Sequence, residues 1–272
     1  MPLATLDIAS GDTVATLAPS RGGMATRLRV GAREVLYLDE ATLLDETKNV
    51  RGGSPVLFPS PGKLAGDAWA RGGRSGALKQ HGFARNLAWT VESRVDSETT
   101  LAIASTPATR EVYPWDFRVT LRYALRARAL RIEQTVTNTG GGPMPFGFGF
   151  HPYFAFTQAA KAGLAVATRA TRGFDNVTKK EVAIDGPLDL TAPEVDMHLY
   201  DHGSTESALG DVVVRASAEY THWVVWTLRG KDFVCLEPWT CPGNALNTGE
   251  RLIELAPGAS RALWVEYSLR DR

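Results

Sequence analysis

Histidine and glutamate side chains that could carry acid/base chemistry occur in two short motifs of this 272-residue sequence. His151 lies in FGFGFHPYFAF (residues 146–156), and Glu237 lies in FVCLEPW (residues 233–239). Each precedes a proline, which biases the residue before it toward extended backbone and cannot donate to a sheet ladder. We therefore expect both side chains on extended backbone where regular pairing stops. An imidazole and a carboxylate in one cleft could exchange protons with a bound hydroxyl group.

Alternation along these two motifs separates their side chains into two faces. In the first motif the phenylalanines share one face, and Gly147 and Gly149 share the other with His151. Glycine inside a strand often marks the close approach of a neighbouring strand or of a ligand. In the second motif Glu237 faces away from Leu236. The structural alternatives are a hydrogen-bonded core histidine and a salt-bridged carboxylate.

A further histidine lies in QHGFARNLAW (residues 80–89), shortly after RGGSPVLFPSPGKL (residues 51–64). If HGFAR is extended, His81, Phe83 and Arg85 share one face. An imidazole beside a guanidinium would then offer donors for hydroxyl groups or anions. A solvated hairpin edge is the structural alternative.

Other patterns are less typical of a functional site. His198 and His202 are four residues apart, but DMHLYDH has no helical context, so we do not expect a metal pair there. RGGRSG (residues 71–76) lacks the ending of a phosphate-binding loop and is better explained as a hairpin tip. Cys235 and Cys241 are too close together to staple a fold, and no serine or cysteine lies in a nucleophile motif.

The composition is that of an ordinary globular protein. Hydrophobic residues make up 44% and charged residues 22%, and 30 basic against 30 acidic residues leave no net charge. This balance gives no indication of nucleic acid or of an anionic membrane surface as a partner. The first residues lack the pattern of a secretory signal, and no apolar run approaches the ~20 residues that span a bilayer. We expect a cytoplasmic protein.

The elements that must position these residues are short strands separated by turns. The strand segments are rich in β-branched and aromatic residues, and Gly-, Asn- or Pro-containing turns follow them. Short helical turns can form around residues 38–46. No linker or repeat divides residues 1–272, so we predict one all-β domain, a large antiparallel β-sandwich with any ligand on a concave sheet face. The clearest strand segments are 99–105, 117–125, 130–138, 211–217, 222–228 and 262–269.

Four motifs, in this order, resemble the aldose 1-epimerase (galactose mutarotase-like) family: RGGSPVLFPSPGKL, QHGFARNLAW, FGFGFHPYF and VCLEPWT. The ending APGASRALWVEYSL is also similar, so that the resemblance extends from about residue 50 to the C-terminus. It implies a β-supersandwich with a sugar-binding cleft, and a reaction that interconverts the α and β anomers of an aldose. It also implies that no metal or organic cofactor is needed for the chemistry. Separately, we expect a monomer or a homodimer.

The resemblance assigns catalytic roles by motif position. Glu237 resembles the family's catalytic base, and His151 resembles its catalytic acid. Ring opening needs one proton removed from the anomeric hydroxyl and one delivered to the ring oxygen, so we expect Glu237 ionised and His151 protonated in the resting complex. Gly147 and Gly149 would clear the cleft floor so that a sugar ring can reach His151.

The resemblance also assigns sugar-binding roles. His81 resembles the second sugar-binding histidine, and Arg51 and Arg85 match positions that hold substrate oxygens or, in some branches, a phosphate. Asp196, in PEVDMHLYD, is similar to the family's sugar-binding aspartate.

Three functions remain open at the level of the sequence. The first is mutarotation, for which two substrates compete. Segments 60–79 and 234–252 resemble the branch of the family that acts on free aldohexoses. Arg51 and Arg85 instead favour a hexose 6-phosphate, because paired guanidinium groups suit a phosphate. A carbohydrate-binding protein without catalysis is the second, because a fold does not fix a function. A glycoside hydrolase with Asp196 and Glu237 as its paired carboxylates is the third.

Overall fold

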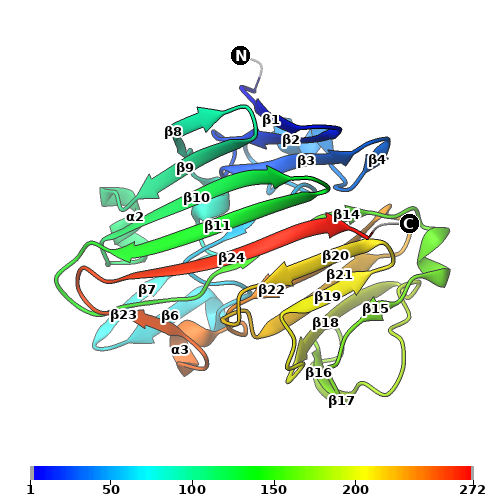
Figure 1. The fold of residues 1–272 in the computed structure, drawn as a ribbon. Coiled ribbons are helices and arrows are strands. Elements are labelled where there is room, and N and C mark those ends of the chain that lie inside the picture. The colour runs from blue at the N-terminus through cyan, green and yellow to red at the C-terminus, as the bar shows by residue number, and fades with distance from the viewer. Residues whose placement is uncertain (1–2, 271–272) are drawn as a thin grey trace.

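Two eight-stranded antiparallel sheets packed face to face make up most of the molecule in the computed structural model, which describes residues 3–270 (Figure 1). The expected all-β, antiparallel architecture is confirmed. A four-stranded sheet at the N-terminal end has the order β1 (Leu6–Ser10), β2 (Thr13–Ala18), β3 (Met24–Val30) and β4 (Arg33–Glu34).

The first large sheet contains the longest strands, and all six strand segments expected from the sequence are present in the structure, five in this sheet and one, β21, in the other. Along these strands buried and partly exposed side chains alternate, so one face enters the core. Its order is β15 (Val166–Ala167), β19 (Glu206–Leu209), β20 (Val212–Ala216), β24 (Ser260–Leu269), β11 (Ala129–Asn138), β10 (Phe117–Arg126), β9 (Glu98–Ala104) and β8 (Thr90–Val95).

The second large sheet carries most of the residues singled out above. Its order is β17 (Lys180–Ala183), β16 (Arg172–Asp175), β18 (Glu194–Tyr200), β21 (His222–Leu228), β22 (Phe233–Trp239), β13 (Gly149–Phe150) and β5 (Val56–Leu57), and β14 (Tyr153–Ala155) also pairs with β22. On β18, Val195 and Leu199 enter the core between the two large sheets. Because side chains alternate along a strand, Asp196 and His198 point to the opposite face.

The remaining elements are short. The smaller hairpins are β6 (Ala68–Arg71) with β7 (Arg74–Ala77) and β12 (Met144–Phe146) with β23 (Ile253–Leu255). The helices are α1 (Glu40–Leu44), α2 (Pro107–Val112) and α3 (Ala245–Thr248), with 3₁₀ turns η1 (Ala65–Asp67), η2 (Ala84–Asn86) and η3 (Ala160–Gly163). Helix α1 confirms the helical turn expected around residues 38–46, and the Asp39 side chain caps it by accepting from the backbone of Ala41 and Thr42. Within residues 3–270 no helix has the length and apolar character needed to cross a membrane.

Candidate active site

A cleft of about 1020 Å³ lies on the face of the second sheet that is turned away from the core. Strands β16, β17, β18, β21 and β22 line it, together with loop residues from segments 49–51, 62–63, 80–85 and 242–251. All six residues singled out from the sequence line this cleft: Arg51, His81, Arg85, His151, Asp196 and Glu237. Segments that are distant in the sequence therefore meet at one place.

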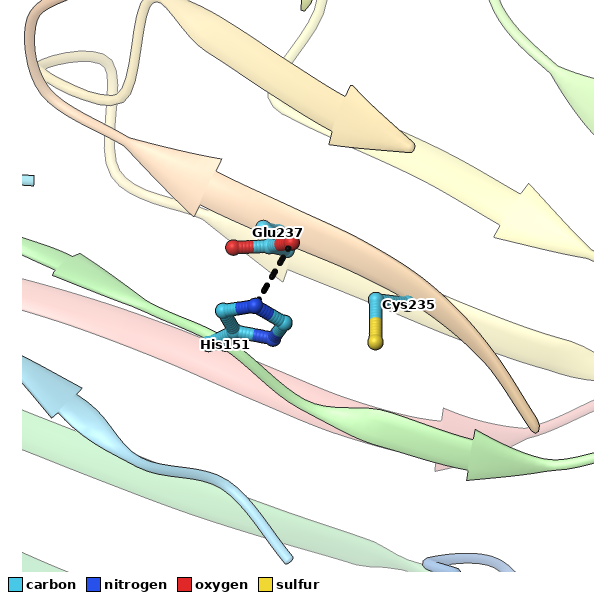
Figure 2. A group of neighbouring side chains, drawn as sticks. All are labelled: His151, Cys235 and Glu237. Carbon is cyan, nitrogen blue, oxygen red and sulfur yellow. Dashed lines mark ion pairs between the residues drawn. The ribbon is translucent and has the colours of Figure 1, made fainter. Parts of the chain in front are cut away.

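Sheet register places His151 opposite Glu237. Gly149 pairs with Trp239 and Tyr153 pairs with Cys235, and His151 and Glu237 lie midway between these pairs. Nε2 of His151 is 3.4 Å from Oε1 of Glu237, with the histidine projecting from between β13 and β14 and the glutamate from β22 (Figure 2). An imidazole and a carboxyl group at this distance can exchange a proton with one another or with a group bound between them.

The regular pairing of β22 does not stop at Glu237, contrary to our expectation. Strand β22 continues through Pro238 to Trp239, and Pro238 lies opposite Trp223 of β21. The expectation is correct at His151, which lies between β13 and β14 in neither strand and donates its backbone N–H to the carbonyl of Pro55, the residue before β5.

Burial favours the neutral forms of both side chains. The side chains of His151 and Glu237 are 12% and 2% exposed. Burial, with the Asp196 carboxylate nearby, raises the pKa of Glu237 well above its usual range, against the effect of a hydrogen bond from Trp239. Burial, reinforced by the Arg85 guanidinium, lowers the pKa of His151 to about 3. In the sugar-free cleft these shifts oppose the expected pair of ionised Glu237 and protonated His151.

Trp239 orients the glutamate. Its indole Nε1 donates to Oε2 of Glu237 at 3.1 Å, which leaves Oε1 directed at His151. The indole also contacts the rings of His81 and His198, with centroid distances of 5.6 and 5.2 Å. The sequence could have indicated this role for Trp239, because its position two residues after Glu237 puts both side chains on the same face of β22.

Gly147 and Gly149 do not form the cleft floor, so this expectation was wrong. A Cβ atom on Gly147 would lie 2.4 Å from the Cys241 sulfur, and one on Gly149 would lie 2.9 Å from Cδ1 of Trp239. Packed neighbours therefore account for both glycines. Gly149 still affects the site, because its missing side chain leaves the space in which Trp239 sits.

His81 is reached by a turn instead of the expected extended strand. His81 and Gly82 have φ values of +68° and +70°, and η2 follows at Ala84. The His81 backbone donates to the Gly62 carbonyl, and its Nδ1 accepts from the Gly62 N–H at 3.1 Å. These bonds make Nε2 the protonated nitrogen of a neutral His81, and burial lowers its pKa well below the usual range.

Asp196 is held by two neighbours that the sequence reasoning missed. Its Oδ1 lies 3.1 Å from Nε2 of His198, and its Oδ2 accepts from the Asn176 amide at 2.6 Å. Although burial acts in the opposite direction, these hydrogen bonds hold the pKa of Asp196 below its usual value. His198 could have been identified from its spacing, since residues two apart on a strand share a face. His202 does not line the cleft and packs against Trp223.

The two arginines line the cleft close enough to His151 for both charges to lower its pKa. The Arg51 guanidinium lies 5.2 Å from the Trp226 ring centre, and Arg85 donates to the Gln80 carbonyl. Neither forms an ion pair within residues 3–270. Nε of Arg85 is buried and has no hydrogen-bond partner among those residues. Both cations are therefore available to oxygen atoms of a ligand.

The fold and the site define a class of protein, an antiparallel β-sandwich with a histidine–glutamate pair in a polar cleft. The profile of the aldose 1-epimerase family matches residues 13–268, so the chain belongs to this family. The match begins well before residue 50, where the resemblance in the sequence became clear.

Individual relatives agree with this assignment. The crystal structure of the Slr1438 protein of Synechocystis sp. PCC 6803 is 36% identical, with a TM-score of 0.96 over 100% of this chain and 97% of that one. A galactose mutarotase-like protein of Lactobacillus casei, 22% identical, superposes with a TM-score of 0.81 over 98% of this chain and 100% of that one, which confirms the galactose mutarotase-like fold. A candidate glucose-6-phosphate 1-epimerase of Cenchrus ciliaris is 27% identical over 80% of this chain and 72% of its own length.

Proposed function

We propose that the protein is an aldose 1-epimerase that interconverts the α and β anomers of a free aldohexose. The observation that carries the proposal is the 3.4 Å approach of His151 to Glu237 inside a polar cleft. Binding alone would not require a buried imidazole and a buried carboxyl group in contact, whereas proton transfer does.

In the proposed reaction Glu237 removes the proton of the anomeric hydroxyl while His151 delivers a proton to the ring oxygen. The bond between C1 and the ring oxygen breaks, and the C1 carbonyl of the open aldehyde forms. Rotation about the C1–C2 bond presents the other face of the carbonyl. Ring closure then reverses both proton transfers and restores the two side chains.

The neutral pair favoured by burial is compatible with this scheme. Neutral Glu237 with neutral His151 holds the same single proton as ionised Glu237 with protonated His151. Transfer across 3.4 Å converts one form into the other. Sugar hydroxyl groups that donate to Glu237 would favour its ionised form, because hydrogen bonds to a charged group stabilise that charge.

The other cleft residues would hold the sugar. Nε2 of His81 can donate to a hydroxyl oxygen, and the Asp196 carboxylate can accept from hydroxyl groups. Trp226 also lines the cleft, where its ring lies edge-on to His151 with a centroid distance of 5.6 Å and holds the Arg51 guanidinium 5.2 Å from its centre. Arg51 and Arg85 can donate to substrate oxygens.

A hexose 6-phosphate is the second candidate substrate. Arg51 and Arg85 lack carboxylate partners among the described residues, as would suit a phosphate group, and some curated relatives are candidate glucose-6-phosphate 1-epimerases. We favour the free sugar because segments 60–79 and 234–252 resemble the branch of the family that acts on free aldohexoses.

Polarimetry or NMR of freshly dissolved α-glucose, α-galactose and glucose 6-phosphate, at fixed ionic strength, tests the proposal. We expect the protein to accelerate mutarotation of a free hexose. A preference of ~10²-fold or more for the phosphate, about 2.7 kcal/mol, that is lost in Arg51→Ala would select the second candidate. Saturable sugar binding without acceleration would instead indicate a carbohydrate-binding protein, and cleavage of an aryl glycoside would indicate a hydrolase.

A further inference from the structure

Cys235 has no part in the proposed reaction, yet it lies beside both residues that do. Its sulfur, a nitrogen of His151 and an oxygen of Glu237 all lie within 4.8 Å of one another. Figure 2 shows the three side chains next to one another, with Cys235 and Glu237 on β22 and His151 on the segment between β13 and β14. Within residues 3–270 no other group of three or more histidine, cysteine, aspartate or glutamate side chains brings its ligand atoms this close together.

We propose that His151, Cys235 and Glu237 form an inhibitory binding site for a thiophilic divalent cation such as Zn²⁺. A thiolate, an imidazole and a carboxylate are all zinc ligands, and three protein ligands with an open fourth position are typical of non-structural zinc sites. Neither magnesium nor calcium suits this set, because both prefer oxygen ligands.

The spacing is close to that of a bound zinc ion. Three atoms within 4.8 Å of one another lie no farther than about 2.8 Å (4.8 Å divided by √3) from a common centre. Zinc binds sulfur at about 2.3 Å and imidazole nitrogen or carboxylate oxygen at about 2.0–2.2 Å. Each ligand atom therefore needs to move inward by less than about 1 Å, which side-chain rotation can supply without a change in the strands.

Two further observations support a ligand at this position. Nδ1 of His151 is buried and has no hydrogen-bond partner among residues 3–270, so no protein group there fixes the tautomer, and Nε2, which faces Glu237, can offer its lone pair to an ion shared with that carboxylate. The sulfur of Cys235 is also unengaged in a disulfide. Asp196 adds negative charge beside the site, whereas Arg51 and Arg85 in the same cleft oppose a cation.

Zinc binding would release the thiol proton of Cys235 and the proton held by the histidine–glutamate pair. The inhibition part of the inference rests on the proposed function: the ion would occupy the place where the anomeric hydroxyl and ring oxygen react. Inhibition should then be competitive with the sugar, raising the apparent KM while kcat stays unchanged.

Direct binding tests the site without reference to activity. We expect Co²⁺, added to chelator-treated protein, to give a thiolate-to-cobalt charge-transfer absorption that Zn²⁺ displaces. Cys235→Ser should abolish this absorption, and Cys241→Ser, which changes the other buried cysteine, should retain it. Cys235→Ala serves if the serine variant does not fold. Absence of the band in the wild-type protein, or its persistence in the Cys235 variants, would overturn the proposal.

Inhibition provides the second measurement. Inhibition is measured against each variant's own rate without zinc. Loss of a partner in the outer shell of a metal site weakens metal binding by about 10–100-fold, and loss of a direct ligand in Cys235→Ser should raise the Zn²⁺ inhibition constant by more than that. Cys241→Ser should leave that constant within about twofold of the wild-type value, since its sulfur lies outside the cluster. Equal inhibition of both variants would place the ion elsewhere and refute the site. A cobalt band in a protein without epimerase activity would leave the site standing and refute the proposed function.

Discussion

His151 lies directly opposite Glu237 across the interruption between β13 and β14, although no ladder hydrogen bond joins the two residues. The flanking pairs Gly149–Trp239 and Tyr153–Cys235 fix this relationship. The backbone N–H of His151 turns away to Pro55, so the imidazole is free to approach the carboxylate from the side. The geometry of the pair therefore depends on backbone register and not on flexible loops.

Replacing either member of the pair should abolish most of the activity. We expect Glu237→Gln and His151→Asn each to lower kcat for mutarotation by at least ~10²-fold, because each removes a proton-transfer group and keeps a similar shape. Polarimetry gives the rates, and far-UV circular dichroism confirms folding. Near-normal turnover in a folded variant would show that the catalytic roles are misassigned.

Trp239→Phe should shift the pH dependence. Loss of the indole N–H removes a hydrogen bond to the Glu237 carboxylate and so raises the pKa of Glu237 further. The part of the pH profile in which kcat rises as Glu237 ionises should therefore move to higher pH. Because hydrogen bonds to charged groups contribute about 1.5–3 kcal/mol, kcat near neutral pH should fall by roughly 10-fold. Profiles of kcat against pH test this.

Trp223→Phe is the matched control for that experiment. Trp223 lies on the core face of β21, and its buried indole N–H has no partner within the described residues. We expect its pH profile to keep the wild-type midpoints. Identical shifts in the two variants would mean that packing, and not the hydrogen bond, sets the pKa.

Gly149→Ala should impair both stability and catalysis. The new Cβ would lie 2.9 Å from Cδ1 of Trp239 and 3.2 Å from Cβ of Pro61, so the indole must shift. Overpacking of this kind costs about 1–3 kcal/mol of unfolding free energy. Urea denaturation and kcat measure the two effects. Gly141→Ala meets no atom within 4 Å and should change neither.

His222 should make the protein sensitive to acid. Burial, with His198 nearby, lowers the pKa of His222 to about 3 in the folded state, whereas the ordinary value of 6.5 applies after unfolding. Below pH 6.5 His222 binds a proton in the unfolded chain but stays neutral in the folded chain. The unfolding free energy is therefore highest above that pH and decreases as the pH falls toward 3. Between pH 7 and pH 5 this loss is about 2 kcal/mol.

Denaturant titrations of wild-type protein and His222→Gln at both pH values measure that loss. The variant should lose less unfolding free energy on acidification than the wild-type protein does. Equal losses would show that other buried histidines, such as His81 and His202, account for the acid sensitivity.

The strands and the partners of the site differ in how far sequence patterns could predict them. Segments such as 117–125 and 130–138 were correctly predicted because apolar and polar residues alternate along them and turn residues bound them. HGFAR was not, since the positive φ of His81 depends on hydrogen bonds to Gly62, nineteen positions earlier in the chain. Asn176 could not be linked to Asp196 from local sequence, because the contact joins the residue after β16 to a residue of β18, twenty positions later.

The sequence by itself determined the all-β class, the family, and the residue types available for acid/base chemistry, because periodicity and motif order are local properties. Only the tertiary structure decided which groups meet: that Trp239 orients Glu237, that Gly149 makes room for that indole, and that Cys235 lies beside His151. It also decided the direction of the pKa shifts, since burial lowers the pKa of His151 and raises that of Glu237. The physical reason is that desolvation and contact depend on the packing of distant segments, which no local pattern specifies.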